Sequence, residues 1–254
     1  MKASIALLED FFRGCDRKGW GYSESEIAAA ETRLSVSFPK VLKQYYSRFG
    51  TCPYIRQEGN NIPVPFALED FFIPDSDYNA PYYTPKELDF LVFSGFTSVS
   101  AIDYGIRLSD LALEDPPVYF CDYGNTSWIL ENASLQNFLV TAAFWQIAEE
   151  SRLDYSLDID EFCFDSEELP DFNIYIAGLG MKGCELENLS DTAHYYRIFI
   201  KDGVILAGET GEWDTAEEPS SEGFVWLTAA SNDKEKIRAL KRIPGLLWEE
   251  DKDI

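Results

Sequence analysis

The pattern closest to a cofactor motif is Gly178-Leu179-Gly180-Met181-Lys182-Gly183, which spells G-x-G-x-x-G. In dinucleotide-binding folds this pattern follows a strand and opens a helix whose N-terminus faces the pyrophosphate. Residues 172–177 are predicted as the strand, and Asp202 closes the next predicted strand. However, the intervening stretch has few apolar residues for a packed helix, and too little chain follows to complete a nucleotide-binding domain. We therefore expect a glycine-rich turn here, and no cofactor.

His194 is the single histidine of the chain. A zinc site would need cysteines or carboxylates from distant positions to join it, and no spacing in the sequence suggests such a set. Alone it could act as a general base, but we favour a histidine that is hydrogen-bonded at the start of a strand. The sequence has no G-x-S-x-G nucleophile elbow and no signal of a Cys–His pair. We expect no catalytic residue, no metal site and no enzymatic activity.

Two acidic runs remain as groups that could bind a partner. Asp158, Asp160 and Glu161 lack the glycine and the closing glutamate of a calcium-binding loop. One interpretation is a solvated acidic linker over residues 151–171; the alternative is a surface that imitates a phosphate backbone and occupies the basic site of another protein. The second run combines carboxylates with an aromatic anchor of the kind that interfaces favour. The candidate partner-binding residues are Asp158, Asp160, Glu161, Glu209, Trp213 and Asp214.

Composition restricts the class of partner. The chain has 254 residues, of which 46% are hydrophobic, and a formal net charge of -24. Such a charge disfavours nucleic acids and anionic membranes and favours basic protein partners. Five cysteines without a C-x-x-C pair indicate reduced thiols and a cytoplasmic location. Glu9 and Asp10 end the first apolar run too early for a signal peptide, and no stretch is long enough to span a membrane.

The clearest structural signal lies between residues 22 and 50. Ser23 and Glu26 have the S-x-x-E spacing of a capping box, which predicts that a helix begins there. Pro39 then starts a second helix after a tight corner, and Gly50 is predicted to end it in the left-handed conformation. The apolar face of that second helix consists of Leu42, Tyr45, Tyr46 and Phe49.

Alternating apolar residues predict an antiparallel sheet after residue 89. Ser134 caps a predicted helix that runs to about residue 148 and is apolar on most sides. Helices, then a meandering sheet, then a covering helix describe an α+β fold. The predicted strands are residues 90–93, 98–104, 118–121 and 126–130.

The C-terminal part has elements of its own. A hairpin is predicted at Asp202-Gly203, a further strand over residues 224–228, and Asn232 is predicted to cap the last helix. This part is either an α+β extension of the first sheet or a small second domain. The predicted division of the chain is residues 1–150, an acidic linker over 151–171, and residues 172–254.

The two helices and the sheet together resemble the SUKH superfamily, whose entry motif is a capped helix with a glutamate, Leu-Pro and a tyrosine-bearing helix ending in Asn-Gly. Here Phe38 replaces the leucine and Phe49 the asparagine. The matching residues are Ser23-Glu24-Ser25-Glu26-Ile27, Glu31, Leu34, Phe38-Pro39, Leu42, Tyr45 and Phe49-Gly50, then Leu91-Val92-Phe93, Asp103-Tyr104-Gly105-Ile106, Leu108-Ser109-Asp110-Leu111, Asp115-Pro116-Pro117-Val118, Trp128, and Ser134-Leu135 with Phe138-Leu139.

The resemblance covers residues 4–150 and implies a function. The superfamily joins fungal regulators of cell-wall synthesis to bacterial immunity proteins of polymorphic toxin systems. It implies a cytoplasmic protein-binding module with a SUKH-like fold, of which an immunity protein that occludes a basic toxin domain is one form. The alternative that it implies is an intracellular regulatory scaffold for cell-wall synthesis or signalling.

Overall fold

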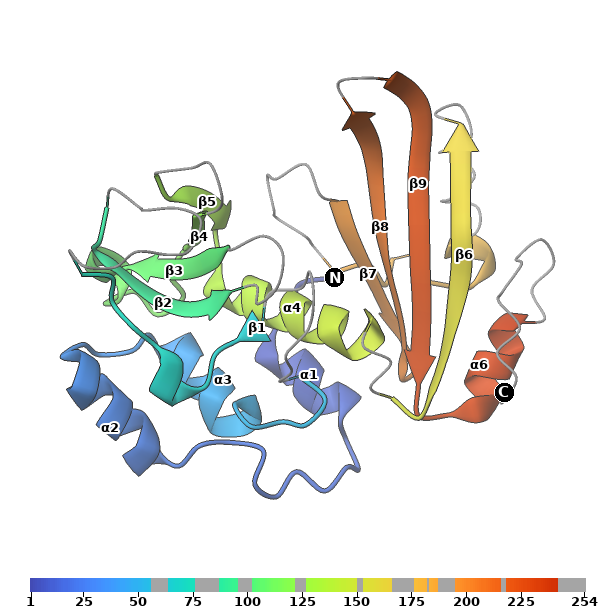
Figure 1. Cartoon of the computed structure of the whole chain (residues 1–254). Coiled ribbons are helices and arrows are strands. Elements are labelled where there is room, and N and C mark those ends of the chain that lie inside the picture. Colours follow the sequence, from blue (N-terminus) through green and yellow to red (C-terminus); the bar gives the residue numbers. More distant parts are fainter. Residues whose placement is uncertain are drawn as a thin grey trace. The chain divides into compact units, whose positions relative to one another are not determined.

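A computed structural model of the chain (Figure 1) describes residues 1–55, 64–75, 87–95, 102–121, 127–149, 153–165, 176–181, 183–186, 195–215 and 218–241. Over residues 157–165, 195–196, 209–215 and 218–227 it describes strand pairing only, and at residues 149 and 241 the helical backbone only. The chain divides into two compact units, one formed by Ala3–Gln146 and the other by Ile147–Ile254 with Met1–Lys2. The predicted boundaries at residues 150 and 171, and independent folding of the C-terminal part, remain predictions.

Three helices begin the first unit: α1 (Ile5–Phe11), α2 (Glu24–Leu34) and α3 (Lys40–Phe49). The predicted capping box of α2 is confirmed, because the Glu26 amide donates to Ser23 Oγ at 3.3 Å and the Ser23 amide donates to Glu26 Oε2 at 2.8 Å. Trp20, just before this cap, is buried with its ring centroid 5.1 Å from that of Phe12.

The corner between α2 and α3 is built around Ser35, which has φ 57° and ψ 36° and ends α2 in the left-handed region. Glu31 crosses the corner, since its Oε1 accepts the Phe38 amide at 2.6 Å and the Lys43 ammonium at 3.2 Å. Pro39 lies one residue before the first helical residue of α3 and has φ -54°. The glutamate therefore fixes the angle at which α3 leaves α2.

Gly50 is not left-handed, so this prediction was wrong. Its φ is -60° and its ψ is -18°, which is ordinary right-handed geometry. The position requires glycine for a different reason. A Cβ atom there would lie 2.6 Å from the Tyr22 ring and 2.7 Å from the Tyr46 carbonyl oxygen, so only glycine lets the chain pass.

The first sheet is a five-stranded antiparallel meander in the order β1-β2-β3-β4-β5, which confirms the predicted α+β class. Figure 1 shows α2 and α3 on one side of it. Short 3-10 helices (η1, Leu68–Asp70; η2, Leu108–Asp110) interrupt its connections. Its strands are β1 (Val64–Pro65), β2 (Phe90–Gly95), β3 (Asp103–Arg107), β4 (Val118–Cys121) and β5 (Ile129–Asn132).

Helix α4 (Leu135–Glu149) packs against the helix-facing side of this sheet. The Phe138 ring lies 5.8 Å from Phe93 and 4.9 Å from Tyr104, measured between centroids. Ser134 caps α4 as predicted, because its Oγ accepts the Asn137 amide at 3.1 Å. Asp115 adds a second cap from the β3–β4 connection, since it accepts the Gln136 amide at 2.8 Å and the Ser134 hydroxyl at 2.7 Å. Both caps stabilise the α4 N-terminus.

The second unit contains a four-stranded antiparallel sheet in the order β6-β9-β8-β7. Its strands are β6 (Tyr155–Asp165), β7 (Tyr195–Lys201), β8 (Val204–Thr215) and β9 (Glu218–Ser231). The expected hairpin at Asp202-Gly203 is confirmed, with φ 50° and 77° at the two residues, as a type I′ turn requires.

The interval expected as a solvated linker, residues 151–171, therefore contains strand β6. Its apolar residues alternate as Leu157 and Ile159 and then, after a slip of one residue, as Phe162 and Phe164. The pairing with β9 shifts at the same place, so one extra residue in β6 absorbs the slip. The high content of carboxylates concealed this strand pattern. Residues 166–171 lie outside the described residues.

Two smaller expectations for the second unit also need correction. Ile176 and Ala177, expected to end a strand, form a helical turn with Gly178. The last helix, α6 (Lys234–Lys241), is capped by Asp233 rather than by Asn232, because Asp233 Oδ1 accepts the Glu235 amide at 3.0 Å. Asn232 instead accepts the Asp154 amide at 3.1 Å and so joins the end of β9 to the start of β6.

Candidate functional site

The second sheet brings residues of both acidic runs into one row. The pairing of β6 with β9 shifts by one residue at Asp160 and Glu161, which lie together opposite Trp226. On the other side of β9, Glu209 of β8 pairs with the same Trp226. We call Asp160, Glu161, Trp226 and Glu209 the acidic row. Three carboxylate-bearing positions from two distant segments thus flank one tryptophan position.

Of the three other predicted partner-binding residues, one lies near the acidic row and two lie near the turn between β8 and β9. Asp158 pairs with Thr228, two residues along β9 from Trp226, and therefore shares a face of the sheet with that tryptophan. Asp214 pairs with Pro219 near the turn between β8 and β9, and Trp213 lies at the register shift beside it. The sheet therefore brings Asp158 close to the acidic row and leaves Trp213 and Asp214 outside it.

Trp226 is the residue of the row that sequence reasoning missed. It lies within the stretch predicted as a strand, residues 224–228, but the pattern of that strand alone does not reveal its neighbours. The slip in the alternation of β6 at Asp160 and Glu161 was the available signal, because bulges are common where a strand presents residues for binding.

The first sheet carries a second candidate surface on the face away from the helices. Phe90, Val92, Cys121 and Trp128 form a buried cluster there, flanked by the half-buried side chains of Phe66, Phe72 and Tyr119. We call these seven residues the outer-face cluster. Trp128 is anchored because its indole N–H donates to the Glu87 carbonyl oxygen at 3.0 Å. The cluster gives this side of the sheet a hydrophobic layer of its own.

Arg107 lies over the edge of this cluster. Its guanidinium carbon is 5.0 Å from the centre of the Tyr119 ring and 5.5 Å from that of Phe90, which are cation–π distances. Its Nη2 is 3.8 Å from a Glu87 carboxylate oxygen, and the arginine side chain is 41% exposed. Arginine and tyrosine are the side chains that protein interfaces use most as anchors.

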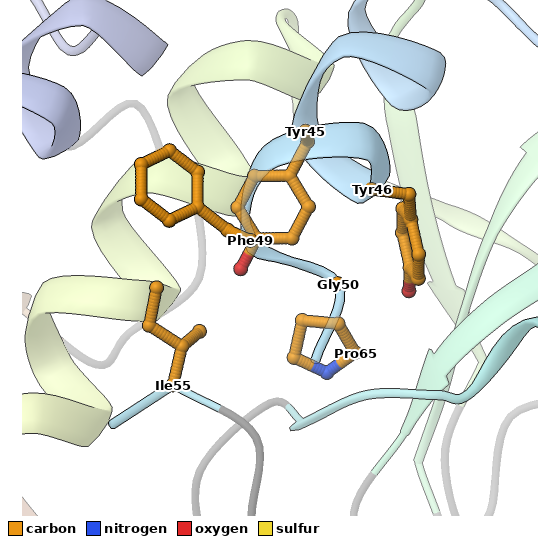
Figure 2. A pocket seen from close by; sticks show the side chains of 6 residues that line it. All are labelled: Tyr45, Tyr46, Phe49, Gly50, Ile55 and Pro65. Atoms are coloured by element: carbon orange, nitrogen blue, oxygen red, sulfur yellow. The ribbon is translucent and has the colours of Figure 1, made fainter. Parts of the chain in front are cut away.

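A small pocket lies at the C-terminal end of α3 (Figure 2). Its volume is about 10 Å³, close to the space that one water molecule needs and far below that of a metabolite site. Six residues line it: Tyr45, Tyr46, Phe49, Gly50, Ile55 and Pro65. The pocket is therefore a packing defect of the core rather than a substrate site.

Two buried titratable groups lie in this region. Tyr45 is buried, its hydroxyl has no hydrogen-bond partner among the described residues, and burial raises its pKa far above the ordinary value. Burial also raises the pKa of the Cys52 thiol to about 11. Hydrogen bonds that its sulfur accepts from the Tyr54 and Ile55 amides lower this pKa, but by less than burial raises it. A thiol with this pKa stays protonated and unreactive at neutral pH. Among the described residues, Cys15 and Cys184 are half-buried free cysteines.

The glycine motif of residues 178–183 lacks the setting of a dinucleotide site among the residues described. It follows a helical turn rather than a strand, and Gly180 and Gly183 have φ of 70° and 80°, as in turns. Lys201 closes the turn by donating to the Gly180 carbonyl oxygen at 2.8 Å. His194 lies outside the described residues. Over the part of the chain with described side chains, no group of three potential metal ligands occurs.

Residues 21–141 match the family model of the SMI1 / KNR4 family (SUKH-1). This part of the chain belongs to that family. The match covers α2, α3, the first sheet and the start of α4. It supports a general protein-binding role, either in regulation or in immunity. The chain matches none of the curated proteins and none of the solved structures with which it was compared. None of the described helices is long and apolar enough to cross a membrane.

Proposed function

We propose that the protein is an immunity protein of the SUKH type, which binds a basic toxin domain in the cytoplasm and occludes the active site of that domain. The role is one of binding, without a catalytic step. The family match supports protein binding in general, and the acidic row supports a basic partner.

The observation that carries the proposal is the convergence of Asp160 and Glu161 of β6 with Glu209 of β8 on either side of Trp226. Tight interfaces commonly use an aromatic residue as an anchor with charged residues around it, and the acidic row combines these two residue types. The β-bulge matters because it places two acidic residues where a regular strand would place one.

The acidic row, on a chain whose net charge is -24, determines the expected kinetics. A negative surface raises the encounter rate with a positive one, and added salt screens this attraction over a Debye length of about 8–10 Å. Association with the partner should therefore slow steeply as salt is added, whereas dissociation should respond less.

The test starts from a partner captured by the immobilised full chain and identified by mass spectrometry. Its association rate is then measured against salt for the wild type and for the triple variant Asp160→Asn, Glu161→Gln, Glu209→Gln. The matched control neutralises three exposed carboxylates of the first unit: Glu24→Gln, Glu69→Gln and Asp70→Asn. We expect the first variant to lose about tenfold in association rate and most of its salt dependence, and the control to retain both.

A growth assay separates immunity from regulation. Expression of the captured partner alone should stop bacterial growth, and co-expression of this chain should restore it. A partner that is harmless when expressed alone contradicts the immunity proposal and leaves the regulatory scaffold. Equal behaviour of the two triple variants would instead show that the acidic row is not the binding surface.

A further inference from the structure

The β5 edge of the first sheet is an unusual place for apolar side chains. Among the described residues, β5 is the last strand of that sheet and pairs with β4 alone. Ile129 and Leu130 are consecutive in β5 and are 41% and 42% exposed. Proteins commonly protect such edges with charges or prolines, because unpaired backbone groups recruit other strands.

The exposed leucine is continuous with the outer-face cluster. Leu130 pairs directly with Tyr119 of β4, and directly opposed residues of an antiparallel pair lie on the same face of the sheet. Tyr119 in turn has the Phe90 ring at 5.6 Å in an edge-to-face arrangement and the Arg107 guanidinium at 5.0 Å. A strip of Leu130, Tyr119 and Arg107 therefore runs from the sheet edge onto rigidly held aromatic rings.

A β-bulge limits where a further strand could pair. The register of β4 with β5 shifts between Val118 and Tyr119, which leaves Glu131 as the extra residue of β5. Regular pairing along the outer side of β5 is thus confined to Ile129 and Leu130, whose side chains lie on opposite faces. A strand added there would need apolar residues at two consecutive positions to cover both.

We propose that the β5 edge is a docking site for an extended, basic segment of a partner protein, which adds to the first sheet as a sixth strand. Backbone hydrogen bonds to β5 would supply affinity, and apolar contacts with Ile129, Leu130 and Tyr119 would supply specificity. The chain's net charge of -24 favours lysine or arginine in the flanking positions.

A second copy of this chain is a poorer occupant. Pairing β5 with its symmetry mate would bring together two chains that each carry a net charge of -24. The basic segment removes this repulsion and replaces it with attraction. The surface is distinct from the acidic row, which belongs to the other unit, so that each proposal can fail alone.

The test uses fluorescein-labelled peptides about eight residues long, a usual strand length, in about 150 mM salt. The probe has two consecutive valines at its centre, flanked by lysines; a second peptide has glutamate in place of lysine, and a third has a central proline. Anisotropy is measured with the full chain, with Leu130→Ser and with the control Leu113→Ser, a leucine that is 51% exposed outside the strand.

We expect the basic peptide to bind the wild type and Leu113→Ser equally and Leu130→Ser about tenfold more weakly, with no binding of the other two peptides. The acidic-row variant should bind it as the wild type does. Equal binding of the proline peptide, or an unchanged affinity in Leu130→Ser, overturns strand addition. Analytical ultracentrifugation tests the other occupant. If the wild type sediments as a dimer and Leu130→Ser as a monomer, the occupant of the β5 edge is a second copy of this chain and not a basic segment.

Discussion

The indole of Trp128 lies nearly parallel to the Phe90 ring, with centroids 4.2 Å apart and planes inclined by 15°. Gly105 makes this stack possible. A Cβ atom at residue 105 would lie 3.1 Å from the indole and 3.2 Å from the Leu91 carbonyl oxygen. Trp128, which comes just before β5, can therefore lie flat across β3 and reach β2.

Gly105→Ala should test this packing. The added methyl group has a ring on one side and backbone on the other, so we expect the free energy of unfolding in urea to fall by about 1–3 kcal/mol. Gly178→Ala is the control, because its Cβ would meet no atom within 4 Å. Its stability should change by no more than about 0.5 kcal/mol. Similar losses in both variants would show that the outer-face stack is not the cause.

Tyr45 and Tyr46 are neighbours in α3 with opposite hydrogen-bonding states. Beside the small pocket, the buried Tyr45 hydroxyl has no partner in the part of the chain that the structure describes, whereas the Tyr46 hydroxyl donates to the Phe66 carbonyl oxygen at 2.8 Å. Tyr45→Phe removes a buried unsatisfied group and should raise the free energy of unfolding by about 1 kcal/mol. Tyr46→Phe leaves a carbonyl unpaired and should lower it by about 1–2 kcal/mol.

Chemical denaturation of both variants at neutral pH is the measurement. If Tyr45→Phe destabilises the protein as much as Tyr46→Phe does, a water molecule in the pocket satisfies the Tyr45 hydroxyl. In that case the tyrosine is a polar anchor rather than a defect.

The parts of the fold that could be predicted are those with local signals. The capping box at Ser23 and Glu26, the cap at Ser134 and the turn at Asp202-Gly203 each depend on neighbouring residues, and each is confirmed. Gly50 shows the limit of such reasoning. A glycine after a helix usually marks a left-handed end, but here it marks the approach of Tyr22, which depends on tertiary packing.

The candidate site depended on information that a single strand does not carry. Asp160, Glu161 and Glu209 could be selected by their charge, but their meeting at Trp226 follows from the strand order β6-β9-β8. Likewise, the exposure of Leu130 follows from the position of β5 at the end of the sheet. Residue type is local, whereas pairing between distant strands is set by the whole sheet.

The capping box should contribute stability in a pH-dependent way. Hydrogen bonds from the Ser23 side chain and then from its amide lower the pKa of Glu26 below the ordinary value. A carboxyl with a lowered folded-state pKa stabilises the fold above its unfolded pKa and loses this effect as the pH falls through the folded value. The stability advantage of the wild type over Glu26→Gln should therefore shrink between neutral pH and about pH 3.

The measurement is the free energy of unfolding in urea across this pH range. It is made for the wild type, Ser23→Ala, Glu26→Gln and the double variant. Ser23→Ala removes the larger of the two hydrogen bonds, so that its own pH dependence should approach that of Glu26→Gln. A wild-type advantage that stays constant with pH would contradict the assigned role of Glu26.

Arg33 ties α2 to the connection between β1 and β2 through two hydrogen bonds. Its Nη1 donates to the Phe71 carbonyl oxygen at 3.0 Å and its Nη2 to the Leu68 carbonyl oxygen at 2.6 Å. Arg33→Met leaves two carbonyls without their donors and should lower the free energy of unfolding by about 1–3 kcal/mol. Arg33→Lys should recover less than half of this loss, because an ammonium group cannot reproduce the planar fork.

Arg48 provides the matched control at the end of α3. It makes a surface ion pair with Glu9, at 3.2 Å between Nη1 and Oε1, with side chains that are 43% and 32% exposed. Arg48→Met should therefore lower stability by no more than about 1 kcal/mol, and this small loss should disappear in high salt. The Arg33→Met loss should persist in salt, because its bonds are made to partly buried backbone. Equal losses in the two variants, both removed by salt, would reduce Arg33 to an ordinary surface charge.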